Sequence, residues 1–377
     1  MTAFGDRKIG SGEPCLIVAE LGTSHQGDLE RARALVDAAI SAGAECIKTQ
    51  LVHAEEILHP LSGIVDLPAG RIALYERFTA LERPLEFYAE LKSYAESKGA
   101  LFLCSPFGTR SALELRSLGV RALKIASPEL NHFPLLREVA GYGLPLLLSS
   151  GVSTLCDIER ALEITGTSNV VLLHCITAYP APEAEYNLGV LASLRAVFGV
   201  EVGLSDHSLD PVLVPVLAVL NGACVIEKHF TLSRESAGLD DPIALEPAAF
   251  RTMVERVREA EREGGRTSRS GSATAFGAVR EKLEREYGAD RVRAAQGTGV
   301  KTLAPSERAN YSTTNRSIHA VAEIRQGALI RPADVAVLRT EKVLRPGLGP
   351  EHLRLVIGAR AKRTIPAGEG VEWADLI

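Results

Sequence analysis

Side chains that bind anions or metal ions gather at the ends of eight short aliphatic runs in this sequence. A chain without catalytic function would place some of these residues in the intervening segments instead. Their regular placement therefore predicts an active site built from the run ends. The residues are Glu20, Lys48 with Gln50, Ser105, Lys124 with Ser127 and Glu129, Ser149 with Ser150, His174, Ser205-Asp206-His207 and Glu227-Lys228-His229.

Two histidines of this set suit a metal ion. His207 and His229 end neighbouring runs, so their imidazoles would converge and leave coordination positions open for water and substrate, as a catalytic divalent cation requires. A hydrogen-bonded structural role is the alternative for each histidine. For His174 we favour that structural role, because a cysteine and a Tyr-Pro turn follow it.

The lysines and hydroxyls form a set of anion-binding donors. Lys48 and Lys124, with Ser105, Ser127 and Ser149, suit a small ligand that carries both phosphate and carboxylate. A Schiff-base aldolase would also place a lysine at a strand end. Such an enzyme needs one lysine and no metal, so the histidine pair argues against it.

The carboxylates leave two roles open. Glu20 and Glu129 are candidates for acid–base catalysis or for orienting water, and each could instead hold a lysine in place. If Glu227 and His229 point inward, Lys228 points outward, because side chains alternate along a strand. We expect Lys228 to form a salt bridge to a surrounding helix.

The alternation of aliphatic runs with amphipathic segments predicts the fold. Eight strand–helix units over about 250 residues favour a parallel, closed (β/α)8 (TIM) barrel, with the active site at the carboxyl ends of its strands. An open doubly wound sheet is the alternative, although the Rossmann glycine fingerprint is missing after the first run. The predicted strands are Leu16–Glu20, Glu45–Gln50, Leu101–Ser105, Ala122–Ala126, Pro145–Ser149, Val170–His174, Val202–Ser205 and Val225–His229.

Apolar residues at three- and four-residue spacing predict helices between these strands. Asp28 and Thr154 are the expected caps of two of them. The predicted helices include Asp28–Ala42, Pro84–Lys98, Leu155–Thr165 and Pro211–Asn221.

The chain divides into three parts. Residues 1–263 form the barrel, residues 264–316 read as a linker with one short helix at Val279–Tyr287, and residues 317–377 form a small β-rich module. The module contains a repeat with identical spacing, which suggests two pseudo-symmetric halves. Ile324, Gly327, Ile330, Asp334 and Val335 match Ile365, Gly368, Val371, Asp375 and Leu376.

Composition limits the class of protein. The chain has 377 residues and a net charge of −5, which gives no basic footprint for nucleic acid. No apolar run approaches the ~20 residues that cross a bilayer. The six cysteines include no CxxC pair and lie mostly in apolar runs, as reduced thiols do. We expect a cytoplasmic protein without a membrane or nucleic-acid partner.

With these residues in place, the sequence resembles the N-acetylneuraminate (sialic acid) synthase family, which includes the legionaminic and pseudaminic acid synthases. The resemblance covers nearly the whole chain apart from the linker, and its final part resembles that family's antifreeze-like (SAF) domain. The stretches that carry it are Val18–Gly27, Ile47–Gln50, Ser105–Phe107, Leu123–Leu130, Leu148–Gly151, Leu173–Cys175, Tyr179–Pro182, Ser205–His207, Glu227–Leu232, Asn315–Ile318 and Arg345–Gly347.

The resemblance implies a condensation of phosphoenolpyruvate with an open-chain N-acetylated hexosamine. It implies that His207 and His229 hold a divalent cation, typically Mn²⁺, with Mg²⁺ or Co²⁺ as alternatives. Lys124 would bind phosphate together with Ser105, Ser127 and Ser149. Lys48 would lie at the reacting phosphoenolpyruvate, and Glu20 would contact the sugar or the attacking water. Other implied ligands around the sugar or metal are Gln50, Phe107, Glu129, Thr177, Tyr179 and Asp240.

The resemblance further implies a domain-swapped homodimer, in which Arg316 of one subunit enters the barrel of the other. Several positions depart from the family pattern, and they cluster on the sugar side. Buried polar contacts discriminate strongly between sugars, so these positions point to a different amino sugar. The departures are Ser24, Gln26, Pro128, Thr177, Asp241 and Ala244, with Ser105 as a smaller one.

Two other functions stay open at this point. One is a related phosphoenolpyruvate-dependent synthase that makes a shorter 3-deoxy sugar acid from a phosphorylated aldose, although the sequence shows no second basic cluster for that phosphate. The other is a sugar-binding protein that has lost catalysis. Absence of bound divalent metal in the purified protein would favour the second.

Overall fold

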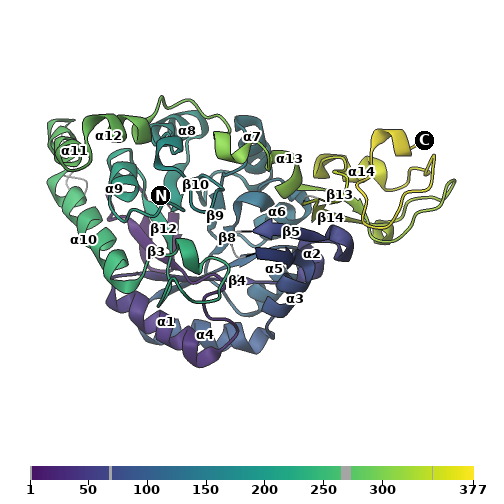
Figure 1. Ribbon diagram of the computed structural model, residues 1–377, viewed down its shortest axis with the longest axis horizontal. Coiled ribbons are helices and arrows are strands. Elements are labelled where there is room, and N and C mark those ends of the chain that lie inside the picture. The colour runs from purple at the N-terminus through teal and green to yellow at the C-terminus, as the bar shows by residue number, and fades with distance from the viewer. Residues whose placement is uncertain (1, 68–69, 265–272, 342) are drawn as a thin grey trace.

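A barrel of eight parallel strands forms the centre of the molecule. The computed structural model describes residues 2–67, 70–264, 273–341 and 343–377 (Figure 1). The strands are β3 (Leu16–Glu20), β4 (Cys46–Leu51), β7 (Leu101–Pro106), β8 (Leu123–Ile125), β9 (Leu146–Ser149), β10 (Val170–Cys175), β11 (Glu201–Asp206) and β12 (Val225–His229). Their order is β7-β4-β3-β12-β11-β10-β9-β8, and β7 lies against β8. The predicted barrel is confirmed, and the open sheet was the wrong alternative.

Side chains alternate between the lumen of the barrel and the surrounding helices. In β3, Leu16 and Val18 belong to the lumen cluster, whereas Ile17 and Ala19 pack under the helices. The same alternation turns some polar strand residues inward and others outward. Lumen-facing residues are Glu20, Lys48, Gln50, Ser105, Lys124, Ser149, Ser205, Glu227 and His229, and outward-facing ones are His174, Asp206 and Lys228.

Helices cover the outside of the barrel. Asp28 caps the first through a bond from Arg31 N, and Thr154 caps another through Asp157 N, as predicted. The helices are α1 (Leu29–Ser41), α4 (Leu85–Ser97), α5 (Thr109–Ser117), α6 (Phe133–Ala140), α7 (Leu155–Thr165), α8 (Val190–Phe198), α9 (Leu213–Leu220) and α10 (Pro247–Glu263).

Two further segments lie at the ends of the barrel, an amino-terminal extension and an insertion. An amino-terminal hairpin, β1 (Thr2–Phe4) and β2 (Arg7–Ile9), packs Phe4 and Ile9 into the lumen cluster and closes that end. Between β4 and α4 the chain adds α2 (Ala54–Ile57), the hairpin β5 (Ile64–Leu67) and β6 (Gly70–Ala73), and α3 (Leu74–Leu81).

The segment predicted as a linker is largely helical and packs on the barrel. It contains α11 (Ala273–Tyr287) and α12 (Ala289–Gln296), and Val279, Leu283 and Val292 are buried in the barrel core. The chain then runs over α8 and α7 to α13 (Tyr311–Thr314) (Figure 1). A single predicted helix was too few, because the short, polar sequence of α12 carries little apolar periodicity.

The carboxyl-terminal module confirms the internal repeat. It contains the antiparallel pair β13 (Arg316–Ala320) and β14 (Val335–Arg339) and the short helix α14 (Leu353–Val356). Its two halves meet where Ile324 and Ile365 exchange backbone hydrogen bonds of 2.9 and 2.8 Å. Equivalent glycines, Gly327 and Gly368, have φ of +81° and +83°. The repeated spacing therefore reports repeated local geometry.

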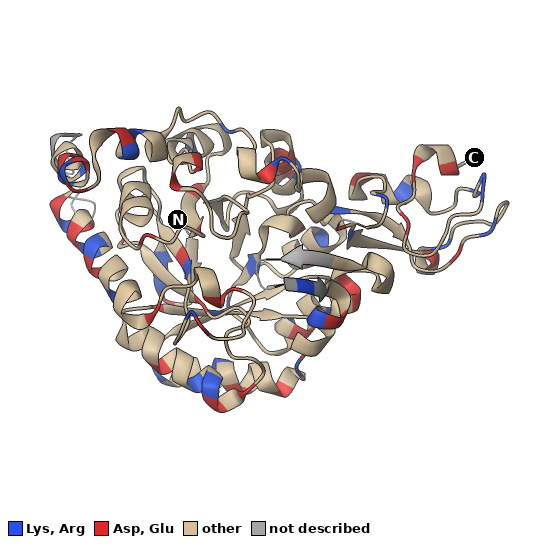
Figure 2. Ribbon diagram, viewed as in Figure 1, with Lys and Arg blue, Asp and Glu red and all other residues tan. Residues whose placement is uncertain are grey.

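The outer surface mixes both charges. Lys and Arg alternate with Asp and Glu along the outer helices (Figure 2). All six cysteines are free thiols, and only Cys156 is exposed. Within the described ranges, no helix is long and apolar enough to cross a membrane.

Candidate active site

The predicted lysines meet two glutamates at the carboxyl end of the barrel. Lys48 Nζ lies 2.5 Å from Glu20 Oε2 and 3.6 Å from Glu227 Oε1, and Lys124 Nζ lies 3.6 Å from the same Glu227 oxygen. Gln50 donates to Glu20 Oε1 at 2.6 Å. Parallel register places Glu20 beside Lys48 on adjacent strands, Glu227 lies on the strand at the other side of β3, and Lys124 reaches Glu227 from β8. We call Glu20, Lys48, Lys124 and Glu227 the lysine–glutamate cluster.

Burial and pairing set the charges of this cluster. Burial opposes the charge on Lys48, but Glu20 and Glu227 outweigh it and raise the pKa of Lys48. Burial lowers the pKa of Lys124, and Glu227 compensates only in part. Burial acts to raise the pKa of Glu227, but Lys124 and Lys48 reverse this and lower it. Lys124 is therefore the cation that gains most from an additional anion.

Serine hydroxyl groups beside the lysines have hydrogen-bonding capacity that the described chain does not use. Ser105 Oγ and Ser149 Oγ are buried and have no hydrogen-bond partner within the described chain. Ser127 Oγ accepts from Gly151 N at 3.0 Å, which leaves its proton to donate. Buried polar groups are normally paired, so these hydroxyls, with Lys124, form a receptor for an anion such as phosphate.

The two histidines converge on the β11–β12 side of the barrel mouth, opposite Lys124 of β8. The rings of His207 and His229 lie 5.4 Å apart, and Tyr179 stacks on His207 at 4.3 Å between centroids. His207 Nδ1 bonds to Ile176 O at 2.8 Å, which leaves Nε2 for a ligand. His229 Nδ1 is buried without a hydrogen-bond partner in the described chain. Burial, then His207 and Lys48, lower the pKa of His229, so the imidazole is neutral.

These histidines fit a divalent cation. Asp240 Oδ2 lies 3.9 Å from His229 Nδ1, and burial followed by Glu20 raises the pKa of Asp240 to about 6. No group of three or more His, Cys, Asp or Glu residues within the described ranges is arranged to surround a metal. The imidazoles of His207 and His229 would therefore supply the protein ligands, and the remaining positions would be open to water and substrate.

A third group joins the carboxyl-terminal module to the barrel. Glu129 forms ion pairs with both Arg316 and Arg339, and the Arg316 guanidinium also donates to Phe107 O at 2.8 Å. Burial opposes ionisation of Glu129, but the two arginines outweigh it and lower its pKa. Arg316 thus reaches a barrel mouth, and in this single chain the barrel is its own.

A family model described as the NeuB family matches residues 35–269, and a model of the SAF domain matches residues 315–377. The chain belongs to the NeuB family. It is 31% identical to the N,N'-diacetyllegionaminic acid synthase of Legionella pneumophila, over 99% of this chain and 97% of that protein. Relatives of this kind are synthases, and this NeuB-family chain is an enzyme.

Solved structures agree with this membership. The spore coat polysaccharide biosynthesis protein SpsE of Bacillus subtilis has a TM-score of 0.82 and 31% identity, covering 100% of this chain and 98% of that one. The N-acetylneuraminic acid synthetase of Leptospira borgpetersenii, solved with citrate, has a TM-score of 0.66 and 30% identity, covering 76% and 97%.

Ser24 and Asp241, two positions that the sequence resemblance marks as departures, form one contact. Ser24 Oγ donates to Asp241 Oδ1, and both side chains are buried. Asp241 also accepts from Gly238 N at 2.7 Å, so it shapes the loop that carries Asp240. The two substitutions therefore belong together, at the side of the mouth where the histidines lie.

Polar residues on the outer face have structural roles. Lys228 pairs with Asp206 of the neighbouring strand at 2.6 Å, whereas a helix residue was expected. The prediction of its direction was correct, but its partner comes from the sheet. His174 Nε2 bonds to Tyr186 O at 2.6 Å, as the structural interpretation requires.

Sequence reasoning missed three contributors to this NeuB-family site. Alternation places Glu227 inward, but it received no role although it bridges both lysines. Arg339 reaches Glu129 because its strand position is opposite Arg316, which no local pattern reveals. Glu307 bonds to two strand-end loops from the segment interpreted as linker.

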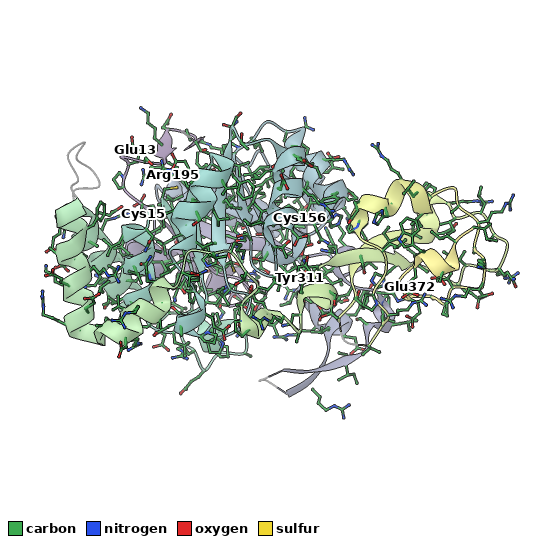
Figure 3. The ribbon with its side chains drawn as sticks, turned by 90° about the horizontal axis from the view of Figure 1, so that it is seen from above. Glu13, Cys15, Cys156, Arg195, Tyr311 and Glu372 are labelled. Atoms are coloured by element: carbon green, nitrogen blue, oxygen red, sulfur yellow. The ribbon has the colours of Figure 1, made fainter. Side chains whose placement is uncertain are left out.

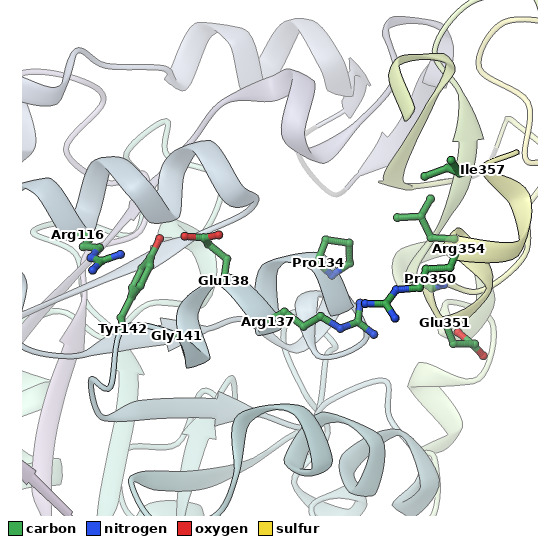
Figure 4. A pocket seen from close by; sticks show the side chains of 11 residues that line it. Arg116, Pro134, Arg137, Glu138, Gly141, Tyr142, Pro350, Glu351, Arg354 and Ile357 are labelled. Atoms are coloured by element: carbon green, nitrogen blue, oxygen red, sulfur yellow. The ribbon is translucent and has the colours of Figure 1, made fainter. Parts of the chain in front are cut away.

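A cavity of about 470 Å³ lies away from this site, between α6 and the carboxyl-terminal module (Figure 4). Arg116, Arg137 and Arg354 lie along it, with Glu138 and Glu351. None of the predicted site residues lines this cavity. The candidate active site is therefore the barrel mouth.

Proposed function

We propose that this enzyme condenses phosphoenolpyruvate with an N-acetylated hexosamine, N-acetylmannosamine or a related amino sugar, to give a nonulosonic acid and inorganic phosphate. The observation that carries the proposal is the receptor of Lys124 and unpartnered serine hydroxyls, which faces a pair of histidines across one barrel mouth. One side suits a phosphorylated enol acid and the other a polarised sugar aldehyde.

The residues of the receptor bind and orient phosphoenolpyruvate. Lys124 and the hydroxyls of Ser105, Ser127 and Ser149 hold the phosphate, and Lys48 neutralises charge beside the reacting carbons. C3 of phosphoenolpyruvate forms a bond to the aldehyde carbon of the sugar. Water adds at C2, and the C2–O bond to phosphate breaks to release inorganic phosphate.

Glu20 manages the proton of the attacking water. Its carboxylate is held by Lys48 and Gln50 at 2.5 and 2.6 Å, so its orientation is fixed before substrate arrives. A water molecule beside Glu20 can give it a proton while adding to C2. Only one Glu20 oxygen is ion-paired, whereas each oxygen of Glu129 forms an ion pair with an arginine, and these two arginines outweigh burial and lower the pKa of Glu129. Glu129 therefore stays ionised and acts by positioning Arg316 and Arg339.

A divalent cation, Mn²⁺ with Mg²⁺ or Co²⁺ as alternatives, is part of this proposal. His207 and His229 would hold it, and the bound ion would act as a Lewis acid on the carbonyl oxygen of the open-chain sugar. Tyr179 and Asp240 flank these histidines and would order the sugar hydroxyls around it.

The first test is phosphate release from phosphoenolpyruvate with Mn²⁺, across a panel of amino sugars. The panel contains N-acetylmannosamine, di-N-acetylated hexoses and phosphorylated aldoses. Release with an N-acetylated hexosamine that a chelator abolishes supports the proposal. Release only with a phosphorylated aldose supports the shorter ulosonate synthase, and no release with metal bound supports a retired sugar-binding protein.

A homodimer that exchanges its carboxyl-terminal modules is also part of the proposal. The contacts that join Arg316 to Glu129 within one chain would then form between two chains. Mixing an Arg316→Ala protein with a Lys124→Ala protein tests this, because subunit exchange would restore some intact sites. A mixture with no activity above the sum of its parts would leave Arg316 serving its own barrel.

A further inference from the structure

The loop after β9 is held by side chains from outside the barrel. This loop, 150–152, directly follows Ser149, a predicted phosphate ligand. Lys301 Nζ donates to Ser150 O at 3.0 Å, and Asn315 Nδ2 donates to Val152 O at 3.0 Å. Both residues belong to the segment between α12 and the module, which crosses the barrel above α7 (Figure 1).

Glu307 of the same segment joins two strand ends. It is completely buried, and its Oε1 accepts from Val152 N at 2.7 Å and from Thr177 N at 2.8 Å. Val152 follows β9 and Thr177 follows β10. One carboxylate oxygen therefore fixes the spacing of two neighbouring loops at the barrel mouth, while its Oε2 accepts from Ala304 N at 3.1 Å.

The loop needs this support. Val152 has a φ of +43°, in the left-handed region that a β-branched residue rarely adopts. Such a conformation persists only where surrounding contacts impose it. Here the Val152 N–H donates to Glu307, and the Val152 carbonyl accepts from Asn315. Side chains of the segment between α12 and the module therefore fix both polar groups of the Val152 backbone.

Movement of the loop would reach the predicted substrate ligands. Gly151 N donates to Ser127 Oγ at 3.0 Å. A Cβ atom on Gly151 would lie 2.1 Å from Thr177 Oγ1 and 2.9 Å from Ser127 Oγ, so the loop is packed directly against both. A shift of a few tenths of an ångström at Val152 would therefore move the phosphate receptor.

We propose that Glu307 is a positioning residue of this enzyme, which holds the 150–152 loop and the Thr177 loop at the spacing that phosphoenolpyruvate binding requires. The inference rests on the proposed function and extends the site to a segment outside the barrel sheet. Glu307 touches no substrate in this arrangement and acts through backbone N–H groups.

Calorimetric titration of phosphoenolpyruvate into the full-length protein tests this role. Loss of the two bonds to the Val152 and Thr177 loops in Glu307→Ala should weaken affinity about tenfold. Glu307→Gln keeps an amide oxygen that can accept both N–H groups, so its loss should be about threefold. In turnover assays, KM for phosphoenolpyruvate should rise more than kcat falls.

Tyr311→Phe is the matched control. Tyr311 lies on the same segment where it meets the module (Figure 3), and its hydroxyl donates to Asp157 of α7 at 2.8 Å. This variant should bind phosphoenolpyruvate as the wild type does. A comparable loss of affinity in Tyr311→Phe would assign the effect to the whole segment and overturn the specific role of Glu307.

The outcomes separate the two claims. A wild type that does not bind phosphoenolpyruvate refutes the proposed function. A wild type that binds it, with unchanged affinity in Glu307→Ala, refutes the positioning role even if Tm falls. If Glu307→Ala does not fold, Asn315→Ala serves instead, because it releases only the Val152 carbonyl; unchanged affinity in that variant counts against the inference.

Discussion

Lysines on the two faces of the same barrel wall have opposite environments. On the outer face, Lys228 Nζ lies 2.6 Å from Asp206, 2.5 Å from Ser208 O and 3.2 Å from Ser208 Oγ. In the lumen, the polar neighbours of Lys124 Nζ among the described residues are Ile125 O at 3.3 Å and Glu227 at 3.6 Å. Both are buried, so burial does not distinguish them. The two lysines differ in how many hydrogen bonds their ammonium groups make. An ammonium with unused donors can bind a ligand, whereas one with all donors used serves a structural ion pair.

The strongest test of this contrast is Lys228→Met. The change leaves the Asp206 carboxylate buried without its cation, which should lower the free energy of unfolding by about 3–5 kcal/mol. Turnover per folded molecule should stay near the wild-type value. Chemical unfolding measures the loss, and Lys98→Met, which removes an exposed pair with Asp37 at 3.2 Å, is the control with a much smaller loss.

The second test removes a lumen histidine. His229→Ala should lower kcat about a hundredfold or more, because a metal ligand contributes several kcal/mol of transition-state stabilisation. Stability should change little, since Nδ1 of this imidazole has no hydrogen bond to lose. Kinetics together with metal analysis of the purified variant check both statements. Normal turnover without bound metal would remove His229 from the ligand set.

The third test is Lys124→Ala. Loss of its charge-assisted bonds to phosphate should raise KM for phosphoenolpyruvate about ten- to a hundredfold. The free energy of unfolding should not fall, because burial of this ammonium is poorly compensated and its pKa is lowered. Initial rates over a range of phosphoenolpyruvate concentrations decide it. An unchanged KM would mean that the phosphate binds elsewhere.

The smallest expected effect concerns pH. Burial lowers the pKa of His174 to about 3, and that of His132, His25 and His319 to between about 3 and about 4. Below the ordinary pKa of 6.5, these histidines are protonated in the unfolded chain but stay neutral in the folded chain. Stability is therefore complete above that value and decreases as the pH falls.

Each of these histidines should contribute about 1 kcal/mol of lost stability between pH 6.5 and 5.5. His174→Gln should remove the contribution of one histidine. The free energy of unfolding of the variant should therefore fall less than that of the wild type over this pH interval. Urea unfolding at the two pH values measures the difference. An equal loss in both proteins would mean that His174 is protonated in the folded state.

The barrel could be predicted from the sequence because its signals are local. Aliphatic runs gave the bounds of β3 and β12 to the residue, and the capping residues Asp28 and Thr154 marked their helices. Most predicted ligands also follow from strand ends. Parallel strands bring their carboxyl ends to one mouth, so the order of residues along the chain sufficed.

Contacts between segments that are distant in the sequence could not be predicted, because no local sequence pattern indicates them. Glu307 and Arg339 come from regions whose local pattern indicates only loops and a short strand, yet each supports the mouth of the barrel. The partner of Lys228 was wrong for a related reason, because Asp206 was counted with the residues that face the lumen. The direction of a side chain at a strand end depends on the register of that strand, which cannot be read from the sequence.

Strict alternation along the barrel strands limits how such a protein can change in length. Inserting or deleting one residue within β12 would turn Lys228 into the lumen and press Glu227 and His229 against the helices. Evolution of this chain must therefore proceed by substitution inside the strands. Gains and losses of residues are confined to connections such as the one between β4 and α4, which already carries α2 and α3 and can grow without reversing any side chain at the barrel mouth.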